Sequence, residues 1–184
     1  MNAQRLAASC ERLCIPTVPE EIFTQSICEL VSLDKGWVPH GPDRSLYVRP
    51  LIFGAEGTLA VRPASEYQFL VMTAPVQEYF NRGGKGIYLK AEDRFTRASP
   101  GGTGGAKTAA NYAATLRPMA DSAAAGFDQI LWLDGIEHLH VEEAGQMNIF
   151  FQIDDTVITP QLSGTILPGV TRDSVVHLLR EHAV

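Results

Sequence analysis

Residues 100–116, PGGTGGAKTAANYAATL, hold the residue types in this chain that are best suited to covalent chemistry. Four glycines and an alanine lead into Lys107, and Tyr112 follows within a run of small residues that favours a helix. Glycine lets the backbone turn sharply and lets another group approach it closely. A single long amine in a crowded stretch without acids is a candidate nucleophile, able to form a Schiff base with a carbonyl compound.

Three interpretations of Lys107 stay open from the residues alone. It could be a solvated lysine in a flexible glycine loop. Residues 101–108 also approach the phosphate-binding pattern G-x-x-x-x-G-K-[ST], but Ala106 replaces the final glycine, and Pro100 stands where a strand should run into the loop. The third interpretation is a Schiff-base lysine for an aldehyde cofactor, which needs supporting groups elsewhere in the chain.

Glu142 and Glu143 are candidates for such support because they lie between apolar segments. Successive side chains of a strand point to opposite faces, so we expect one acid to point inward and the other to solvent. An inward carboxylate is costly unless it meets a cation, and a protonated pyridine nitrogen would be such a cation. The alternative places both acids on an exposed hairpin.

Further candidates lie near the two ends of the chain. Val170 and Thr171 follow Leu-Pro-Gly at a predicted helix start, where backbone amides without internal acceptors can hold an anion. Arg49 alternates in phase with Tyr47 in an apolar strand, so the two side chains should share a face. Arg5 and Arg49 could each also be ordinary surface arginines.

The elements that must position these residues follow from periodicity. Apolar spacing predicts helices over 2–14, from a capping box at Thr17 to just before Gly36, around Tyr112, and from about Thr171 onward. Pro118 should kink or end the helix that follows Tyr112. Strands are predicted over 45–54, 66–73, 86–91, 94–98, 129–135, 138–141 and 146–153, the last two as an antiparallel pair. This order indicates an α/β or α+β chain of two lobes.

Bulk composition excludes several classes of protein. The 184 residues are 45% hydrophobic and 20% charged, typical of a globular protein with a buried core. A net charge of −6 and a pI near 5.3 argue against nucleic acid or an anionic membrane as a partner. No signal peptide or membrane-length apolar run is evident, and a cytoplasmic location is expected.

Neither cysteine nor histidine usage indicates a metal site. Cys10 and Cys14 lie four residues apart on a predicted helix and are expected to be small core hydrophobes of a reducing compartment. His138 and His140 alternate beside acids, but no third ligand is evident, so we expect no metal.

Five motifs in this order resemble those of the branched-chain amino-acid aminotransferases, which are fold-type IV pyridoxal-phosphate enzymes. They are LYVRPLIFG, GGTGGAK with the following NY, DQILWLDG, EEAGQMNIFF and LSGTILPGVTRDS, and they span nearly the whole chain. The resemblance implies a two-lobed α/β (α+β) fold, pyridoxal 5'-phosphate as cofactor, a homodimer, and transfer of an amino group between leucine, isoleucine or valine and 2-oxoglutarate. The alternatives are a catalytically inactive remnant of this family, or another fold-type IV enzyme of the D-amino-acid aminotransferase or aminodeoxychorismate lyase type.

The resemblance also implies a role for each candidate residue. Lys107 would carry the Schiff base and move the proton, Tyr112 would hydrogen-bond the cofactor's phenolic oxygen, and Glu143 would face the ring nitrogen. The residues implied to hold the phosphate are Arg5, Val170 and Thr171. Those implied on the substrate side are Tyr47, Arg49 and Val61, the last of which would be lent to the neighbouring subunit's pocket.

By the same resemblance, residues 1–78 are part of a small N-terminal α/β domain, 79–87 are a linker, and 88–184 are part of a large cofactor-binding domain. The chain departs from the family where Ala109 and Ala110 replace a Gly-Gly pair. The family also has strands before, and a long segment after, the part that matches. We therefore expect an incomplete fold, truncated at both ends.

Overall fold

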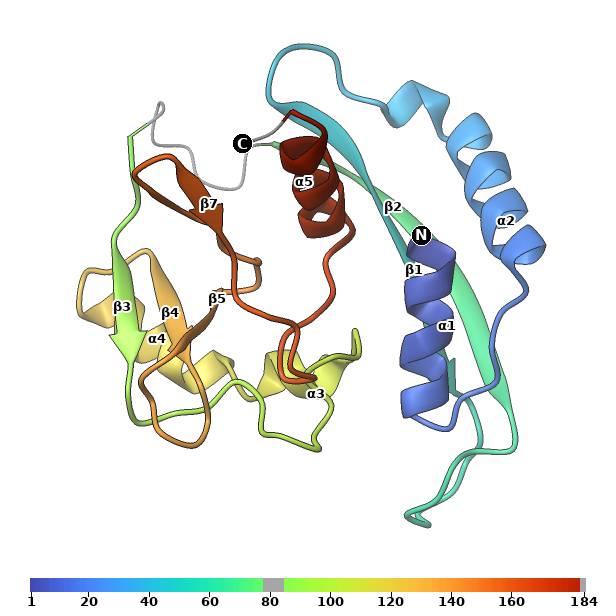
Figure 1. The fold of residues 1–184 in the computed structure, drawn as a ribbon. Coiled ribbons are helices and arrows are strands. Elements are labelled where there is room, and N and C mark those ends of the chain that lie inside the picture. Colours follow the sequence, from blue (N-terminus) through green and yellow to red (C-terminus); the bar gives the residue numbers. More distant parts are fainter. Residues whose placement is uncertain (78–84, 183–184) are drawn as a thin grey trace. The chain divides into compact units, whose positions relative to one another are not determined.

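The computed structural model describes residues 1–77 and 85–182 (Figure 1). The chain divides into two compact units, Met1–Gly84 and Lys85–Val184. Most of the predicted linker, 79–87, lies outside the described residues, so the predicted domain boundaries stay a prediction.

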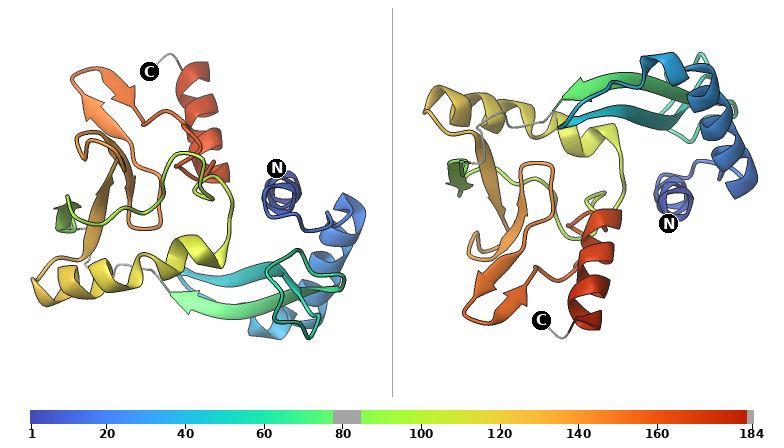
Figure 2. Two further views of the ribbon diagram at one scale, coloured as in Figure 1. Left: turned by 90° about the horizontal axis from the view of Figure 1, so that it is seen from below. Right: turned by 90° about the horizontal axis from the view of Figure 1, so that it is seen from above.

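A long β-hairpin with helices beside it forms the first unit. Its elements are α1 (Asn2–Arg12), α2 (Glu20–Leu33), the 3-10 helix η1 (Lys35–Trp37), β1 (Arg44–Gly54) and β2 (Tyr67–Gln77). The two strands run side by side over their full length (Figures 1 and 2), in an unbroken antiparallel register. Both predicted strands are confirmed. Pro50 causes no bulge because, among the described residues, β1 pairs on one side only, which leaves an edge where a missing N–H is tolerated.

Helix α2 packs on the hairpin through its apolar face. Phe23 is buried, and its ring lies 6.3 Å from that of Phe69 on β2, measured between centroids. The Thr73 hydroxyl donates a hydrogen bond to Asp34 just after the helix ends. The helix thus ends before Gly36 as predicted.

The predicted capping box of α2 is wrong. Pro19 occupies the N-cap position and no side chain caps the helix, which leaves Thr17 outside it and places Glu20 at the first helical position. A capping box needs the glutamate at the third position, so its carboxylate has no amide to reach back to.

The first helix ends two residues earlier than predicted. α1 stops at Arg12, and Cys14 has φ +56°, outside helical geometry. Cys10 is buried as expected, whereas Cys14 is exposed because it lies beyond the helix end. The expectation of two core cysteines is therefore wrong for Cys14.

A three-stranded sheet forms the centre of the second unit. The elements of this unit are β3 (Leu89–Glu92), α3 (Ala109–Ala113), α4 (Leu116–Ala124), β4 (Gln129–Leu133), β5 (Val141–Ala144), β6 (Phe151–Ile153), β7 (Thr156–Ile158) and α5 (Val170–Glu181). In the sheet, β3 is parallel to β4 and β4 is antiparallel to β5. Helix α4 lies in the crossover between the parallel strands and contacts β4. Ile130 and Trp132 on β4 are fully buried and form the centre of the core.

The strand predicted at 94–98 is absent. The Glu92 carboxylate accepts the backbone N–H groups of Arg94 and Phe95, at 3.0 and 3.2 Å, and so turns the chain at the end of β3. The buried side chain of Arg97 then engages the glycine run rather than a sheet.

The predicted pairing of 138–141 with 146–153 is also wrong. β5 pairs with β4, β6 pairs with β7, and a single bridge joins Ala144 to Met147. The reason is the Asp134 carboxylate, which accepts four backbone N–H groups between residues 136 and 140 and holds that stretch as a turn.

The helix after the glycine run is interrupted, but not at Pro118 as predicted. α3 ends at Ala113 and α4 begins at Leu116. Pro118 lies in the first turn of α4, where no intrahelical N–H donor is required.

Candidate functional site

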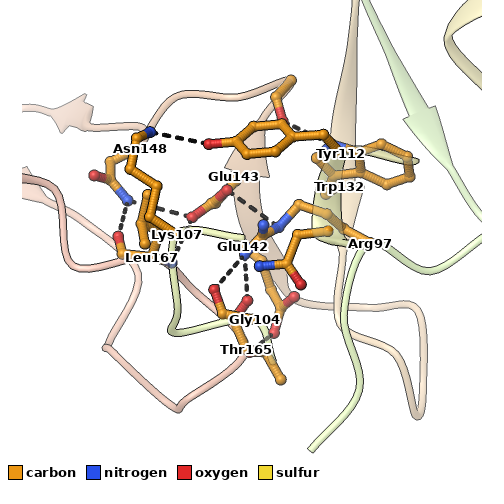
Figure 3. A network of polar contacts seen from close by, with 12 residues as sticks. Arg97, Gly104, Lys107, Tyr112, Trp132, Glu142, Glu143, Asn148, Thr165 and Leu167 are labelled. Carbon is orange, nitrogen blue, oxygen red and sulfur yellow. Dashed lines mark hydrogen bonds and ion pairs between the residues drawn. The ribbon is translucent and has the colours of Figure 1, made fainter. Parts of the chain in front are cut away.

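Lys107 lies between the glycine run and α3, and it points at Tyr112. The lysine Nζ donates a hydrogen bond to the tyrosine hydroxyl over 2.9 Å, and lies 5.6 Å from the centre of the ring (Figure 3). The buried Asn111 side chain fixes this turn, because its Nδ2 donates to the carbonyls of Thr103 and Ala106 at 2.9 and 2.8 Å. Lys107 and Tyr112, five residues apart in the sequence, are thus in direct contact.

The glycine run packs against a distant segment at a distance that excludes side chains. A Cβ added to Gly104 would lie 2.3 Å from the Thr165 carbonyl oxygen, and one added to Gly105 would lie 3.3 Å from that of Gly164. Residues 93–108 contain no strand, so the strand–loop–helix context that a phosphate-binding loop requires is absent from this described segment.

Both acids of β5 are buried, which corrects the expectation that one would face solvent. Glu142 is 6% exposed and Glu143 is 3% exposed. A register irregularity between Trp132 and Leu133 places Leu133 opposite Val141, so that Glu142 is skipped in the pairing. Such a bulge disturbs the strict alternation of side chains on which the expectation depended.

Glu143 is hydrogen-bonded through one carboxylate oxygen and ion-paired through the other, without a hydrogen bond from the Arg97 Nε that faces it. Its Oε1 accepts the backbone N–H of Leu167 at 2.8 Å and a long contact of 3.5 Å from Asn148 Nδ2. Its Oε2 lies 3.1 Å from Nε of Arg97, in a buried ion pair. Figure 3 shows this carboxylate close to the Lys107 side chain.

The ionisation of Glu143 is set by opposing influences. Burial raises its pKa, because desolvation disfavours the charged form, and the neighbouring Glu142 acts in the same direction. Arg97, the Leu167 amide and Lys107 act against that rise. An electrostatic influence of Lys107 on Glu143 means that the predicted amine and the predicted acid share one environment.

Arg97 is the residue that sequence reasoning missed. Its side chain is buried, and its guanidinium donates to the carbonyls of Gly104 and Thr165. A signal existed, because a buried carboxylate needs a cation and Arg97 is the basic residue nearest before the glycine run. The expected strand at 94–98 concealed it.

The segment just before α5 lies against the same carboxylate, through the Leu167 amide. Gly169 is the N-cap, and no side chain caps the first amides of Val170 and Thr171. Asn148 bonds the Leu167 carbonyl at 2.9 Å, and a Cβ on Gly169 would lie 2.0 Å from Asn148 Oδ1. The segment that presents this helix start is therefore tied to the segment around Glu143.

The remaining predicted residues lie in the first unit. Tyr47 and Arg49 share a face of β1 as predicted: the guanidinium donates to the tyrosine hydroxyl at 3.1 Å and lies 5.2 Å from the ring centre. Arg5 on α1 donates to Asn2 at 3.2 Å. Val61, in the loop between β1 and β2, is fully exposed.

A cavity of about 780 Å³ lies on the Glu142 side of β5. Its lining includes Phe151, Ile158, Thr165 and Ile166 beside Glu142, and it includes neither Lys107 nor Glu143. In the part of the chain that the structure describes, no three His, Cys, Asp or Glu residues are grouped as a metal site, and no helix is long and apolar enough to cross a membrane.

Lys107 is hydrogen-bonded to Tyr112, and buried Glu143 and the uncapped start of α5 lie in the same unit. This arrangement agrees with the family motifs found in the sequence. The chain belongs to the family described as amino-transferase class IV, whose model matches residues 1–184. This confirms the predicted family and fold class.

Two relatives within the family carry the same kind of name, branched-chain-amino-acid aminotransferase. The chain is 45% identical to "Branched-chain-amino-acid aminotransferase 2" of Bacillus subtilis (97% of this chain, 49% of the relative) and 46% identical to "Branched-chain-amino-acid aminotransferase" of Mycolicibacterium smegmatis (96% and 50%). The chain thus spans about half the length of the curated relatives it matches.

Two solved structures are similar over nearly the whole chain. One is the branched-chain amino acid aminotransferase of Escherichia coli (25% identity, TM-score 0.80, 99% of this chain and 59% of that one). The other is an aminotransferase from Brucella abortus bound to the cofactor PLP (26% identity, TM-score 0.77, 99% and 62%).

Proposed function

We propose that this chain is part of a pyridoxal-phosphate-dependent aminotransferase that moves an amino group between leucine, isoleucine or valine and 2-oxoglutarate. The observation that carries the proposal is the Lys107 amine, 2.9 Å from the Tyr112 hydroxyl and within the electrostatic reach of buried Glu143. The names of the relatives and the titles of the two solved structures support the reaction and the cofactor.

The chemistry of these side chains fits the cofactor. Pyridoxal phosphate, when bound, supplies an aldehyde and a protonated ring that accepts electrons. Lys107 would hold the cofactor through Nζ, and the same nitrogen, when not so engaged, could accept and return a proton. Tyr112 offers a hydroxyl to the phenolic oxygen, and Glu143 offers a negative charge to the ring nitrogen.

We assign the cofactor's phosphate to the start of α5. The first amides of Val170 and Thr171 have no side-chain cap, and a helix start favours a negative charge. The role of Arg5 in holding the phosphate stays a prediction of the family resemblance, since a guanidinium is suited to a phosphate group.

Tyr47 and Arg49 are proposed on the substrate side. Their mutual contact on β1 holds the guanidinium in one place, where it suits the second carboxylate of glutamate. Val61 is exposed and apolar, as a residue lent to a neighbouring subunit's pocket would be. The proposal therefore includes a homodimer, which sedimentation of the chain tests. It also includes a cytoplasmic location, as expected from the sequence.

Borohydride reduction after incubation with pyridoxal phosphate, followed by peptide mass mapping, tests the function. We expect the phosphopyridoxyl label on Lys107 and its loss in Lys107→Ala. Lys90→Ala is the matched control, because Lys90 already pairs with buried Glu92 at 3.1 Å, and it should keep the label. A protein that stays colourless and unlabelled would instead be the inactive relative that keeps the fold without the cofactor.

A further inference from the structure

Arg97 joins three separate segments of the second unit. It is 8% exposed, and its guanidinium donates to the carbonyl of Gly104, at 3.3 Å, and to that of Thr165. Its Nε lies 3.1 Å from Oε2 of Glu143. The glycine loop that leads to Lys107, the segment before α5, and β5 therefore meet at one guanidinium (Figure 3).

Arg97 supplies a contact to Glu143 that the other groups around this carboxylate do not supply. Oε1 of Glu143 is held by the Leu167 amide at 2.8 Å, which leaves the carboxylate free to rotate about that contact unless Oε2 is also held. Arg97 supplies that second contact and the positive charge that a carboxylate only 3% exposed requires. The planar guanidinium contacts the two carbonyls through Nη2 and the carboxylate through Nε, two separate nitrogens in a fixed plane, whereas an ammonium group has a single nitrogen.

We propose that Arg97 is a positioning residue for Glu143: its guanidinium places a positive charge beside the carboxylate, orients it, and links that orientation to the loop that carries Lys107. The pairing of Glu143 with the cofactor's ring nitrogen rests on the proposed function. The contact between Arg97 and Glu143 is independent of it.

The charged groups that face Glu143 among the described residues set the direction of the effect. Burial and Glu142 raise its pKa, and Arg97 and Lys107 oppose that rise. Removal of Arg97 takes away one of the influences that lower the pKa of Glu143, so the neutral form of the carboxyl group should persist to higher pH. A neutral carboxyl group cannot pair with a protonated ring nitrogen, and cofactor binding should then recover as the pH is raised.

The first experiment uses the cofactor-free chain and NMR of isotopically labelled glutamate side chains, with Glu143→Gln identifying the resonance. In Arg97→Met the titration midpoint of Glu143 should move up by about one pH unit, a tenfold change in proton affinity. Arg97→Lys, which keeps the charge and is the variant to use if the methionine variant does not fold, should move it less. Arg94→Gln, a matched loss of an exposed guanidinium, should leave it unchanged. A midpoint that stays in place in both Arg97 variants overturns the proposal.

The second experiment measures pyridoxal-phosphate affinity by absorbance titration. Arg97→Met should weaken binding, and the loss should become smaller as the pH is raised, because the carboxyl group then returns to its charged form. In a Glu143→Gln background the same change should have little further effect, because the group on which Arg97 acts is gone. Equal losses in both backgrounds would show that Arg97 acts only through the fold, which overturns the proposal. Failure to label Lys107 with borohydride would overturn the proposed function and leave the NMR result to decide on Arg97.

Discussion

At the scale of single residues, the contact between Lys107 and Tyr112 has a measurable consequence. Tyr112→Phe removes the hydroxyl 2.9 Å from the amine and leaves the ring in place. The same change removes the hydrogen bond proposed between Tyr112 and the cofactor's phenolic oxygen, which is worth about 1 kcal/mol, so the affinity for pyridoxal phosphate should fall roughly fivefold in an absorbance titration.

A control variant separates this effect from a general effect of losing a phenol. Tyr88 is exposed and lies just before β3, and Tyr88→Phe should bind the cofactor as the unchanged chain does. An unaltered affinity in Tyr112→Phe would remove Tyr112 from the proposed cofactor contacts.

A contact that follows from a local pattern could be predicted, as for Tyr47 and Arg49 on one face of β1, whereas the roles given to Lys107, Tyr112 and Glu143 stay predictions. Lys107, Tyr112 and Glu143 come together within the second unit, and Tyr47 contacts Arg49. Residues that act through distant contacts were not predictable. Arg97 meets Thr165 across 68 positions of sequence, and periodicity carries no information about such a contact.

At the scale of elements, the glycine run depends on its close approach to the 163–166 segment. Gly104→Ala would place a methyl group 2.3 Å from the Thr165 carbonyl and 2.7 Å from Ala98 Cβ. One of these segments must then move, which should cost about 1–3 kcal/mol. Urea unfolding should detect the loss, and Gly86→Ala, where a Cβ meets nothing within 4 Å, should be nearly neutral.

The turn between β4 and β5 should show a pH-dependent stability. Asp134 accepts the amides of Glu137, His140, Leu139 and Ile136, and these bonds hold the pKa of its carboxyl well below the usual value of 3.8. A lowered pKa in the folded state means that the stabilisation is present above pH 3.8 and is lost as the pH falls toward the folded value.

Asp134→Asn should therefore lower the Tm by a few degrees at neutral pH. The difference from the unchanged chain should shrink in thermal melts carried out at progressively lower pH, below the usual carboxyl pKa. Asp155→Asn, in the exposed turn between β6 and β7, is the control and should show little difference at any pH. A gap that stays constant with pH would contradict the role given to the ionised carboxylate.

Element prediction succeeded where apolar spacing was long and failed where side chains capture the backbone. The strands of the β1–β2 hairpin and helix α2 were predicted because their periodic patterns run for ten residues or more. Glu92 and Asp134 were not recognised as acceptors of backbone amides, and each removes a stretch that the pattern had indicated as strand.

At the scale of the whole molecule, charge and exposed apolar side chains should govern association. The net charge is −6 at pH 7 and the pI is near 5.3, so mutual repulsion between molecules disappears near that pH. Leu33, Leu59 and Val61 are more than four-fifths exposed and can then make contacts between chains.

Light scattering as a function of pH should show a maximum near 5.3 that adding salt does not remove. Leu59→Glu and Val61→Glu add charge where apolar atoms were and should lower that maximum, whereas Thr58→Glu, a neighbouring polar site with the same added charge, should lower it less. An equal effect of all three would mean that charge alone governs association.

The irregular pairing of β5 limits how the chain can tolerate changes in length. Because Glu142 is skipped in the pairing with β4, deleting it would restore a regular ladder. The shortened strand would keep one acid opposite Trp132, so a gain in sheet regularity would accompany the loss of the carboxylate that Thr165 donates to. A loop can gain or lose a residue without moving a side chain from one face of a sheet to the other. In 141–144, by contrast, one residue decides both the regularity of the pairing and whether Thr165 keeps its acceptor.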